Sequence, residues 1–544
     1  MRKMIYIVGF ICTMLALIVI GTMFNQKTTI VQVNGDQVLV VGVKSGETIG
    51  YLHKGFTFYR EDPCEDWCYF TVDEQEVKVA VADVLQTQTR EDVAEAPNLK
   101  ILDTLPIVRN TTLVTYKTET TVKATLLAGQ NLPIVAVEGE WAQVLLLDQL
   151  MYTKLPDSLE EHTSTADQVL MAETATAIYA NESFNQEGEL AILQPNMPIA
   201  YIEETAGAYL VAFGQGKGYI QKSQAQKTEP TAVVDLQLTA KVTGSIATQG
   251  EQATVYKTRS LESEHLVMLL PGLQYPIEGQ WEDWYIVRIG GQVGYVPTAE
   301  ATMGRGVPVL MYHHVLPEKD LGEYKDISTT ITAEAFEQQM DYLVNQQFKV
   351  LTNQELLAYV KGELILPLKS VLITFDDGLL STKEYAYPVL KERGLSALQH
   401  IISARKDREE GFQTFDATAK LQFFTDEEMA KMTDVFSYEA HSFNMHILDP
   451  DTKTSRVLKA SAGELGDDLR QNLEDVPGAT AFAYPFGQYK EETIDVLKEL
   501  NFEMAFTTVE GHAKMGDDAF RIKRFGPTQQ TTIEQFAQYV NEVE

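Results

Sequence analysis

Two pairs of side chains near the end of the chain have the types and spacing that a catalytic metal site needs. Asp376 and Asp377 are adjacent and follow an apolar run, and His441 and His446 stand five positions apart. Two imidazole nitrogens and one carboxylate leave an open position on Zn²⁺ or a similar divalent ion. Each pair also has an ordinary explanation, because Asp-Asp-Gly is a common turn and two histidines can simply lie on the surface.

The spacing of the two pairs limits the backbone that can carry them. Adjacent residues on a strand point to opposite faces, so Asp376 and Asp377 can serve one site only in a turn beyond the strand 371–375. Two residues five positions apart on a helix are separated by about 140°, so His441 and His446 are not a helical metal pair. Both pairs therefore predict loops that follow strands.

Four apolar runs end in residues that can do chemistry, and six of the nine histidines lie between 305 and 544. The runs 307–311, 371–375, 435–440 and 480–483 lead into Tyr312-His313-His314, Asp376-Asp377-Gly378, the segment from His441 to His446, and Tyr484-Pro485-Phe486-Gly487. Amphipathic helices alternate with these runs; Thr332 can cap one whose apolar stripe is Phe336, Met340, Leu343 and Val344. This alternation predicts an α/β unit in which the carboxyl ends of the strands converge on one site.

The motifs at 307–315, 374–378, 441–446 and 484–487 resemble, in order and spacing, those of the polysaccharide deacetylase (NodB-homology) superfamily. The Tyr-His-His opening and the histidine spacing are most similar to the poly-β-1,6-N-acetylglucosamine deacetylase branch. The resemblance implies a distorted (β/α) barrel of about seven strands over 305–544. It also implies removal of N-acetyl groups from N-acetylglucosamine units of a cell-wall or extracellular polysaccharide.

Carried over position by position, the resemblance implies a role for each residue. Asp377, His441 and His446 would hold the divalent metal, which we expect to be Zn²⁺, with Co, Ni or Mn as alternatives. Asp376 would be the general base that takes a proton from an activated water. The backbone N–H of Phe486 would help to stabilise the oxyanion, and acetate and a free glucosamine amine would be the products.

The same resemblance places His313, Tyr484 and Pro485 in the substrate pocket, and it leaves two points open. Many relatives have an arginine two residues before the proline of the Pro-Phe-Gly motif, where this chain has Ala483; the poly-N-acetylglucosamine branch shares this absence. No motif fixes the general acid. His512, which follows a short apolar strand, is the candidate, and an exposed loop histidine is the alternative.

The chain between about 28 and 302 is expected to form short strands and turns with a repeated aromatic position. The repeated aromatics are Trp67, Trp141, Tyr209 and Trp284. This segment resembles bacterial SH3-like (SH3b) domains, which implies all-β small barrels. We place them at 28–90 (the most diverged), 103–157, 169–225 and 239–302. Their role is either to bind the cell wall or to act as a stalk.

The N-terminus predicts a membrane anchor over residues 1–27. Arg2 and Lys3 precede an uncharged apolar run from Met4 to Phe24, long enough as a helix to cross a bilayer. We favour this transmembrane helix over a cleaved signal peptide, since no Ala-x-Ala site follows. The protein would then be a single-pass cell-membrane protein with its bulk outside the cell. There, Cys64 and Cys68 can form a small disulfide.

The formal net charge of −33 argues against nucleic acid or anionic membrane surfaces as partners. It suits a neutral polysaccharide, or one that becomes cationic, although solubility alone explains it too. Within the deacetylase interpretation, the SH3-like copies favour peptidoglycan and the motif variants favour poly-N-acetylglucosamine. One alternative is a catalytically silent wall-binding or adhesion protein with the same fold. Another is a phosphoesterase, but the second set of metal-binding carboxylates that such enzymes use is not found in this sequence.

Overall fold

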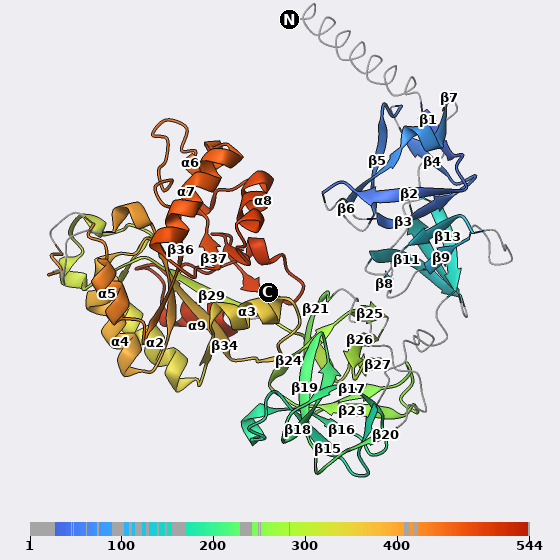
Figure 1. Cartoon of the computed structure of the whole chain (residues 1–544), viewed down its shortest axis with the longest axis horizontal. Helices are drawn as coiled ribbons and strands as arrows, with labels where there is room; N and C mark the ends of the chain where they lie inside the picture. The colour runs from blue at the N-terminus through green and yellow to red at the C-terminus, as the bar shows by residue number, and fades with distance from the viewer. Residues whose placement is uncertain are drawn as a thin grey trace, which may run out of the picture. The chain divides into compact units, whose positions relative to one another are not determined.

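The computed structural model describes residues 28–541 with internal gaps. The gaps lie at 45, 47, 61–62, 73–74, 90–102, 108–110, 115–121, 127–129, 139–140, 147–148, 155–168, 229–241, 249, 251, 282, 407–413 and 418–420. The chain divides into two compact units (Figure 1). Unit 1 comprises Met1–Thr163, Gln237–Lys241 and Gly279–Trp284, and unit 2 comprises Ser164–Leu236, Val242–Glu278 and Tyr285–Glu544.

Unit 1 is built from antiparallel strands, as the sequence predicts. The strands are β1 (Thr28–Val33), β2 (Gln37–Gly42), β3 (Thr48–His53), β4 (Thr57–Arg60), β5 (Trp67–Val72), β6 (Gln75–Ala80), β7 (Val84–Thr89), β8 (Asp103–Ile107), β9 (Thr111–Leu113), β10 (Ala124–Leu126), β11 (Gln130–Glu138), β12 (Trp141–Leu146) and β13 (Gln149–Lys154). They form sheets in the orders β4-β1-β7, β5-β6-β2-β3-β10-β9 and β13-β12-β11-β8. Strand β10 pairs with β3, so the first two predicted barrels share one sheet.

The β part of unit 2 joins the third and fourth predicted barrels. Its strands are β14 (Val169–Met171), β15 (Thr176–Tyr179), β16 (Glu189–Leu193), β17 (Ile199–Glu204), β18 (Ala208–Phe213), β19 (Gly216–Gln221), β20 (Gln226–Thr228), β21 (Gly244–Thr248), β22 (Ala253–Tyr256), β23 (His265–Leu269), β24 (Leu273–Ile277), β26 (Trp284–Ile289), β27 (Gln292–Pro297) and β28 (Ala301–Met303), while β25 (Gly279–Trp281) falls in unit 1. Strand β16 pairs with β23, and a single hydrophobic cluster spans both barrels. The two barrels are therefore one body; their likeness to SH3-like domains stays a prediction.

The rest of unit 2 is the predicted α/β region. Its strands are β29 (Val307–Tyr312), β30 (His314–Leu316), β31 (Thr330–Thr332), β32 (Lys349–Val350), β33 (Leu366–Pro367), β34 (Ser370–Phe375), β35 (Ala397–Ile401), β36 (Phe436–Ala440), β37 (Ala481–Ala483), β38 (Met504–Phe506) and β39 (His512–Ala513). An eight-stranded sheet has the order β38-β37-β36-β35-β34-β29-β39, with β32 on β34. Strands β29 and β34 to β38 run parallel, and β39 is antiparallel to β29.

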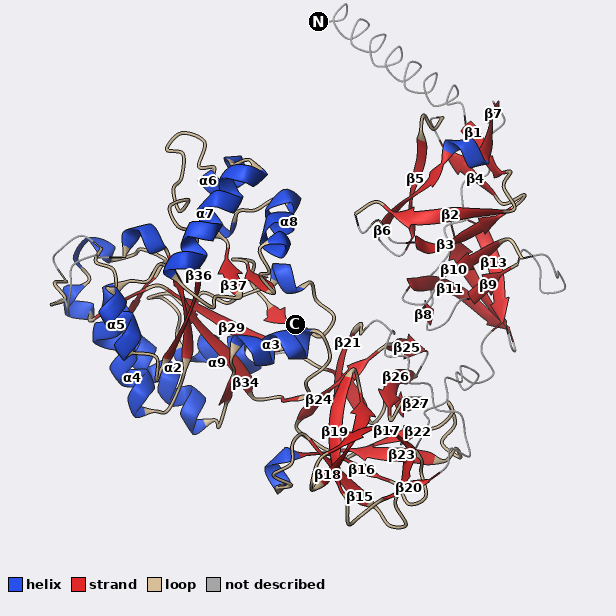
Figure 2. Ribbon diagram, viewed as in Figure 1, coloured by secondary structure: helices blue, strands red, loops and turns tan. Residues whose placement is uncertain are grey.

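The helices surround this sheet (Figure 2). They are α2 (Ala333–Asn345), α3 (Asn353–Val360), α4 (Tyr387–Glu392), α5 (Asp426–Lys431), α6 (Arg456–Lys459), α7 (Ala462–Asp475), α8 (Glu491–Glu499) and α9 (Ile533–Asn541). The predicted cap of α2 is confirmed, because the Thr332 side chain accepts a hydrogen bond from the Ala335 N–H. Phe336, Met340 and Leu343 are buried as expected, but Val344 is 42% exposed, since it lies one residue around the helix from that face.

The two edges of the sheet are linked by the segment 522–525. Ile522 forms a parallel bridge with Phe506 of β38, and Phe525 forms one with Leu310 of β29. The segment therefore closes the sheet into a distorted barrel and brings its own side chains to the inside. Strand β33 leaves the α/β region and pairs with β24 of the β part.

Two expectations concern the N-terminal half of the chain. The structure contains the Cys64–Cys68 disulfide, which confirms that prediction. Among the described residues, no helix is long and apolar enough to cross a membrane. The predicted anchor at residues 1–27 lies outside the described residues.

Candidate metal centre and its surroundings

The Asp-Asp pair lies in a turn directly after β34. The Asp376 N–H donates to the Tyr312 carbonyl at 2.9 Å, which continues the ladder between β34 and β29 for one residue. Asp377 and Gly378 then adopt left-handed backbone angles, with φ of 78° and 74°. This turn lets the two consecutive carboxylates reach the same region, as their sequence spacing predicts.

Asp377, His441 and His446 form a cluster with the dimensions of a metal site. One ligand atom from each lies within 4.8 Å of the others. Asp377 Oδ1 is 3.5 Å from His441 Nε2 and 3.3 Å from His446 Nε2. The His residues come from the segment after β36, so the prediction that a loop beyond a strand brings them together is confirmed.

The protonation of the cluster favours a cation. His441 Nδ1 donates to the Ala483 carbonyl at 2.7 Å, so in the neutral ring Nε2 presents its lone pair to Asp377. Burial lowers the pKa of His446 to about 3, which keeps that ring neutral. Asp377 Oδ1 is buried and has no hydrogen-bond donor among the described residues. Two imidazole nitrogens that can each offer a lone pair beside a carboxylate oxygen fit a divalent metal ion, because a cation would satisfy all three atoms.

Asp376 is held from two sides by buried side chains. Its Oδ1 accepts hydrogen bonds from His400 Nδ1 at 2.8 Å and from Arg524 Nη1 at 2.9 Å. Its Oδ2 accepts from Arg524 Nη2 at 2.8 Å. Burial alone would raise the pKa of Asp376, but the charge of Arg524 outweighs it and holds this pKa well below its usual value. Asp376 is therefore ionised and fixed in orientation.

Sequence reasoning missed both Arg524 and His400. Arg524 is fully buried; its Nε donates to the Thr507 carbonyl at 2.9 Å and its Nη1 to Thr374 Oγ1 at 3.2 Å. Its guanidinium contacts both oxygens of Asp376. The sequence does contain one indication of His400, because it is a titratable residue in a strand, β35 (Ala397–Ile401), whose other residues are apolar or carry an amide. The sequence contains no such indication of Arg524, because the segment around it pairs only through isolated bridges and has no strand pattern.

His313 is brought to the site and His314 is not part of the metal cluster. His313 Nε2 lies 3.9 Å from Asp376 Oδ2. Burial lowers the pKa of His313, while the carboxylates of Asp376 and Asp377 oppose that shift. The ring of His314 instead bonds Ser381 Oγ at 2.6 Å.

The Tyr-Pro-Phe segment is only partly as predicted. Phe486 adopts φ of 58°, its ring centroid lies 4.1 Å from that of His446, and it is 37% exposed, so it forms the rim of the site. Tyr484 is 1% exposed, and its hydroxyl donates to the Phe520 carbonyl at 2.9 Å. Pro485 is also buried. The structure thus gives Tyr484 and Pro485 supporting positions rather than a surface that a polymer reaches.

His512, the predicted acid, lies away from this cluster. It pairs with Pro308 at the amino-terminal end of β29, whereas Asp376 lies beyond the carboxyl-terminal end, next to Tyr312. Its ring is 2% exposed and packs against Phe525. A short apolar strand before a histidine does not reveal which end of the barrel the histidine reaches.

The comparisons with known proteins agree with this chemistry. Residues 365–505 match the family model described as polysaccharide deacetylase. The poly-beta-1,6-N-acetyl-D-glucosamine N-deacetylase of Staphylococcus aureus (strain MRSA252) is 29% identical over 163 residues, which cover 29% of this chain and 54% of that protein. The chain thus spans about half the length of this relative. Both matches lie in the α/β region of unit 2, which is therefore similar to polysaccharide deacetylases.

Solved structures also match this region. IcaB from Ammonifex degensii is 28% identical, with a TM-score of 0.38, and covers 44% of this chain and 98% of its own. The Streptococcus pyogenes deacetylase PplD, in complex with acetate, is 22% identical, with a TM-score of 0.35, and covers 44% of this chain and 99% of its own.

Proposed function

We propose that this protein is a metal-dependent hydrolase that removes N-acetyl groups from N-acetylglucosamine units of an extracellular polysaccharide. The observation that carries the proposal is one ionised, immobilised carboxylate, Asp376, beside a cluster of Asp377, His441 and His446 that fits a cation. The deacetylase family match and the named activity of the Staphylococcus aureus relative support the substrate class.

The metal would be held by Asp377, His441 and His446, and Zn²⁺ remains our expectation, with Co, Ni or Mn as alternatives. When bound, such an ion supplies Lewis acidity, which polarises an amide carbonyl and acidifies water. The protein's own contribution is to orient these three side chains. The Ala483 carbonyl orients His441 through the hydrogen bond to Nδ1.

Asp376 would act as the general base through Oδ2. Its Oδ1 already accepts two hydrogen bonds, from His400 and Arg524, whereas Oδ2 accepts one, from Arg524. Oδ2 therefore keeps a lone pair for the proton of the water that attacks the acetamide carbon. The C–N bond then breaks, acetate leaves, and the nitrogen must gain a proton to depart as an amine.

We assign the delivery of that proton to His313 rather than to His512. His313 Nε2 is 3.9 Å from Asp376 Oδ2, so a proton on the base can pass to this ring and from it to the leaving nitrogen. His512 is buried on the strand pair at the other end of β29 and has no such position. The backbone N–H of Phe486 remains our proposed partner for the oxyanion.

The location outside the cell is part of the proposal. The Cys64–Cys68 disulfide supports this location, because disulfides persist in oxidising compartments such as the outside of the cell. An extracellular polysaccharide substrate is found there too. Residues 1–27 would anchor the chain there as a single-pass membrane helix. Among extracellular polymers, the named relative favours poly-β-1,6-N-acetylglucosamine, and peptidoglycan is the alternative.

Acetate release from a panel of polymers tests the proposal. Purified full-length protein is incubated with poly-β-1,6-N-acetylglucosamine, chitin oligomers and peptidoglycan, and acetate is quantified. We expect release from the β-1,6-linked polymer and none from the Asp377→Ala variant. No release from any of the polymers, by protein that has bound one equivalent of metal, would favour the catalytically silent wall-binding protein instead.

A further inference from the structure

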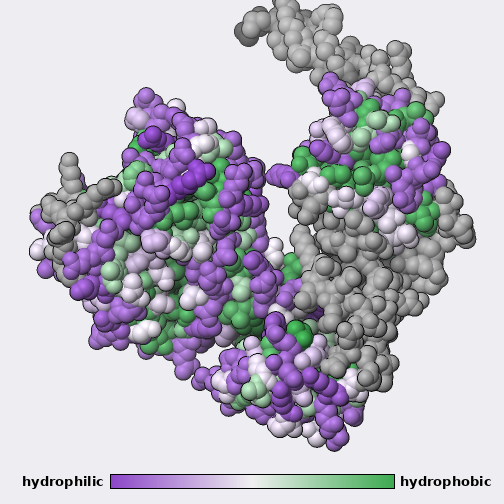
Figure 3. All heavy atoms as spheres, in the orientation of Figure 1, coloured by the Kyte–Doolittle hydropathy of each residue, from purple (hydrophilic) through white to green (hydrophobic). Residues whose placement is uncertain are grey.

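One face of the sheet in unit 1 exposes large apolar side chains. Trp67 and Tyr69 on β5 are 39% and 41% exposed, and they lie two residues apart, so they point to the same side of the strand. Leu39 on β2 is 50% exposed. Figure 3 colours residues by hydropathy, and both hydrophobic and hydrophilic residues lie on the described surface of this unit that it shows. Such a patch on a protein in water indicates an interaction site.

The strand register makes this face continuous. Tyr69 pairs with Lys78 of β6, and Lys78 pairs with Val41 of β2. Leu39, two residues before Val41, pairs with Tyr51 of β3. Paired residues lie on the same side of a sheet, so the face runs across β5, β6, β2 and β3. We call Leu39, Val41, Tyr51, Trp67, Tyr69 and Lys78 the outer face.

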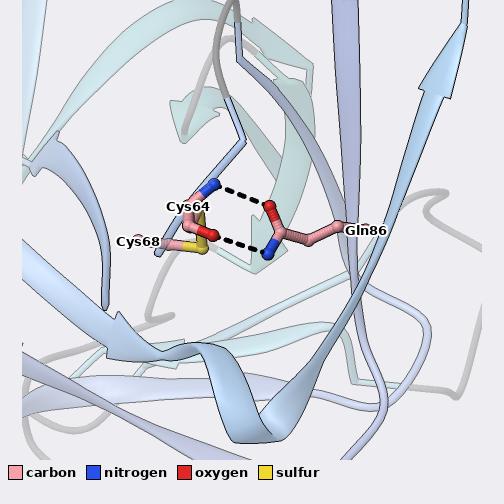
Figure 4. Close-up of a disulfide and its surroundings, with 3 residues drawn as sticks. All are labelled: Cys64, Cys68 and Gln86. Atoms are coloured by element: carbon pink, nitrogen blue, oxygen red, sulfur yellow. Dashed lines mark hydrogen bonds between the residues drawn. A yellow bond between two sulfur atoms is a disulfide. The ribbon is translucent and has the colours of Figure 1, made fainter. Parts of the chain in front are cut away.

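The turn before Trp67 is held by a disulfide and by two hydrogen bonds. The Cys64–Cys68 disulfide closes the short loop that contains Trp67. Gln86 of β7 holds the same loop: its Oε1 accepts from the Cys64 N–H at 2.7 Å, and its Nε2 donates to the Cys64 carbonyl at 3.0 Å (Figure 4). The backbone that carries the exposed ring is therefore held in place before any ligand arrives, which lowers the entropic cost of binding.

The surroundings of the outer face are acidic. Four residues with exposed carboxylates, Asp36, Glu65, Asp66 and Asp83, and one exposed lysine, Lys54, belong to segments at the end of the sheet where Trp67 lies. The Asp66 carbonyl accepts from the Val81 N–H and the Asp83 carbonyl from the Asn34 N–H, which keeps their segments at this end of the sheet. The whole chain carries a net charge of −33. Charge complementarity at this face therefore selects a cationic partner.

Lys78 shows that the aromatic part of the face accepts an ammonium group. Its Nζ lies 4.6 Å from the centroid of the Trp67 ring, in a cation–π arrangement. An amine of a ligand has the same charge and size. It would compete with Lys78 for the ring while pairing with the neighbouring carboxylates.

We propose that the outer face binds a glucosamine-containing polysaccharide, the partly deacetylated product of the catalytic domain. The identity of this occupant rests on the proposed function. The apolar faces of its sugar rings would stack on Trp67 and Tyr69, and its amines would pair with the carboxylates around Trp67. The fully acetylated polymer has the sugar rings without the charge, so it binds more weakly.

Retention on polymer beads tests this site. Full-length protein carrying Asp376→Asn, which leaves the polymer unchanged, is applied to chitosan beads and to chitin beads at low salt. Trp67→Ala with Tyr69→Ala is expected to lower the affinity for chitosan about tenfold, as the loss of two stacking rings implies. Leu85→Ala is the matched control, because Leu85 is 53% exposed but lies on β7 in another sheet; it should not change binding.

Lys78→Met provides a second, independent variant that keeps the fold of the loop. It removes the competing ammonium, so we expect tighter binding to chitosan, and 0.5 M salt should weaken binding in every case. Equal retention of the double variant, equal affinity for chitin and chitosan, or weaker binding of Lys78→Met would each overturn the proposal. Acetate release from short soluble oligomers should be the same for the double variant and the wild type. If the wild type itself releases none, the proposed function fails and the binding result still stands.

Discussion

At the scale of single residues, the site combines one carboxylate held by buried hydrogen-bond donors with one cluster that could hold a metal ion. Asp376 accepts hydrogen bonds from Arg524 and His400, while Asp377 faces the Nε2 atoms of two histidines. The ligand set could be predicted from sequence, because only a loop after a strand makes the spacing of His441 and His446 useful. The residues that hold the base could not, because they come from segments with no motif.

Arg524 and His400 are expected to control turnover through the position of Asp376. Arg524→Lys keeps a positive charge but loses the two-pronged contact, so we expect kcat to fall about 10- to 100-fold with little change in KM. His400→Phe keeps the ring and removes one hydrogen bond, so a smaller fall, of about tenfold, is expected. Steady-state acetate release checks both. A rise in KM with unchanged kcat would contradict a positioning role. The control is Ser381→Ala, which removes a hydroxyl that contacts His314 and the Val315 N–H and does not contact Asp376.

His313 and His512 make opposite predictions about the proton donor. His313→Ala should lower kcat by about 10² to 10³ and remove the limb of the pH–rate profile that reports the acid. His512→Phe preserves the packing against Phe525 and should leave the profile unchanged. The measurement is the pH dependence of kcat for the two variants side by side. A normal profile for His313→Ala together with a lost limb for His512→Phe would reverse the assignment.

At the scale of elements, the turn after β34 and the closing segment 522–525 differ in how well sequence reveals them. A long apolar strand followed by Asp-Asp-Gly marks the first clearly, since glycine is the usual residue at positive φ. The closing segment joins β38 and β29 through single bridges, so it has no alternating pattern that identifies a strand. The structure alone places Arg524 inside the barrel for that reason.

The turn after β34 gives a matched pair of glycine substitutions. Gly378 has φ of 74°, and a Cβ there would lie 2.9 Å from Ile401 Cδ1; Gly394 has φ of 64° and open space around it. Gly394→Ala should cost only the backbone strain, about 1 kcal/mol. Gly378→Ala should cost more and should also displace Asp377, which lowers metal affinity. Thermal unfolding and metal titration of the two variants test this, and equal effects on metal binding would argue against the turn as the positioning element.

At the scale of the whole molecule, unit 2 links its β part to its α/β region through buried polar contacts. Gln274 Oε1 accepts from the Gly306 N–H and from the Tyr359 hydroxyl, both at 3.0 Å, and β24 pairs with β33. The sequence predicts separate barrels connected by linkers, because local patterns show each strand but not its partner in another repeat. Of the four predicted barrels, only the first two, in unit 1, lie wholly outside the unit that contains the α/β region.

Truncation tests whether the β part is integral to the folding of the α/β region. A fragment that begins at residue 305 loses Gln274 and the strand that pairs with Leu366, so it exposes buried polar and apolar groups of α3. We expect its melting temperature to be lower by about 5 °C or more than that of a fragment that begins at residue 164. Equal melting temperatures and equal activity would show that the domain folds independently of the β part.

The most direct test of the central claim is metal-dependent acetate release by the full-length protein and by Asp376→Asn. Both proteins are stripped with a chelator, then titrated with Zn²⁺ while metal content and acetate from a β-1,6-linked N-acetylglucosamine oligomer are measured. The account predicts that both bind one equivalent, since Asp377, His441 and His446 are intact, and that activity returns only in the wild type. Activity in the stripped wild type, or in metal-loaded Asp376→Asn at the wild-type rate, would contradict it.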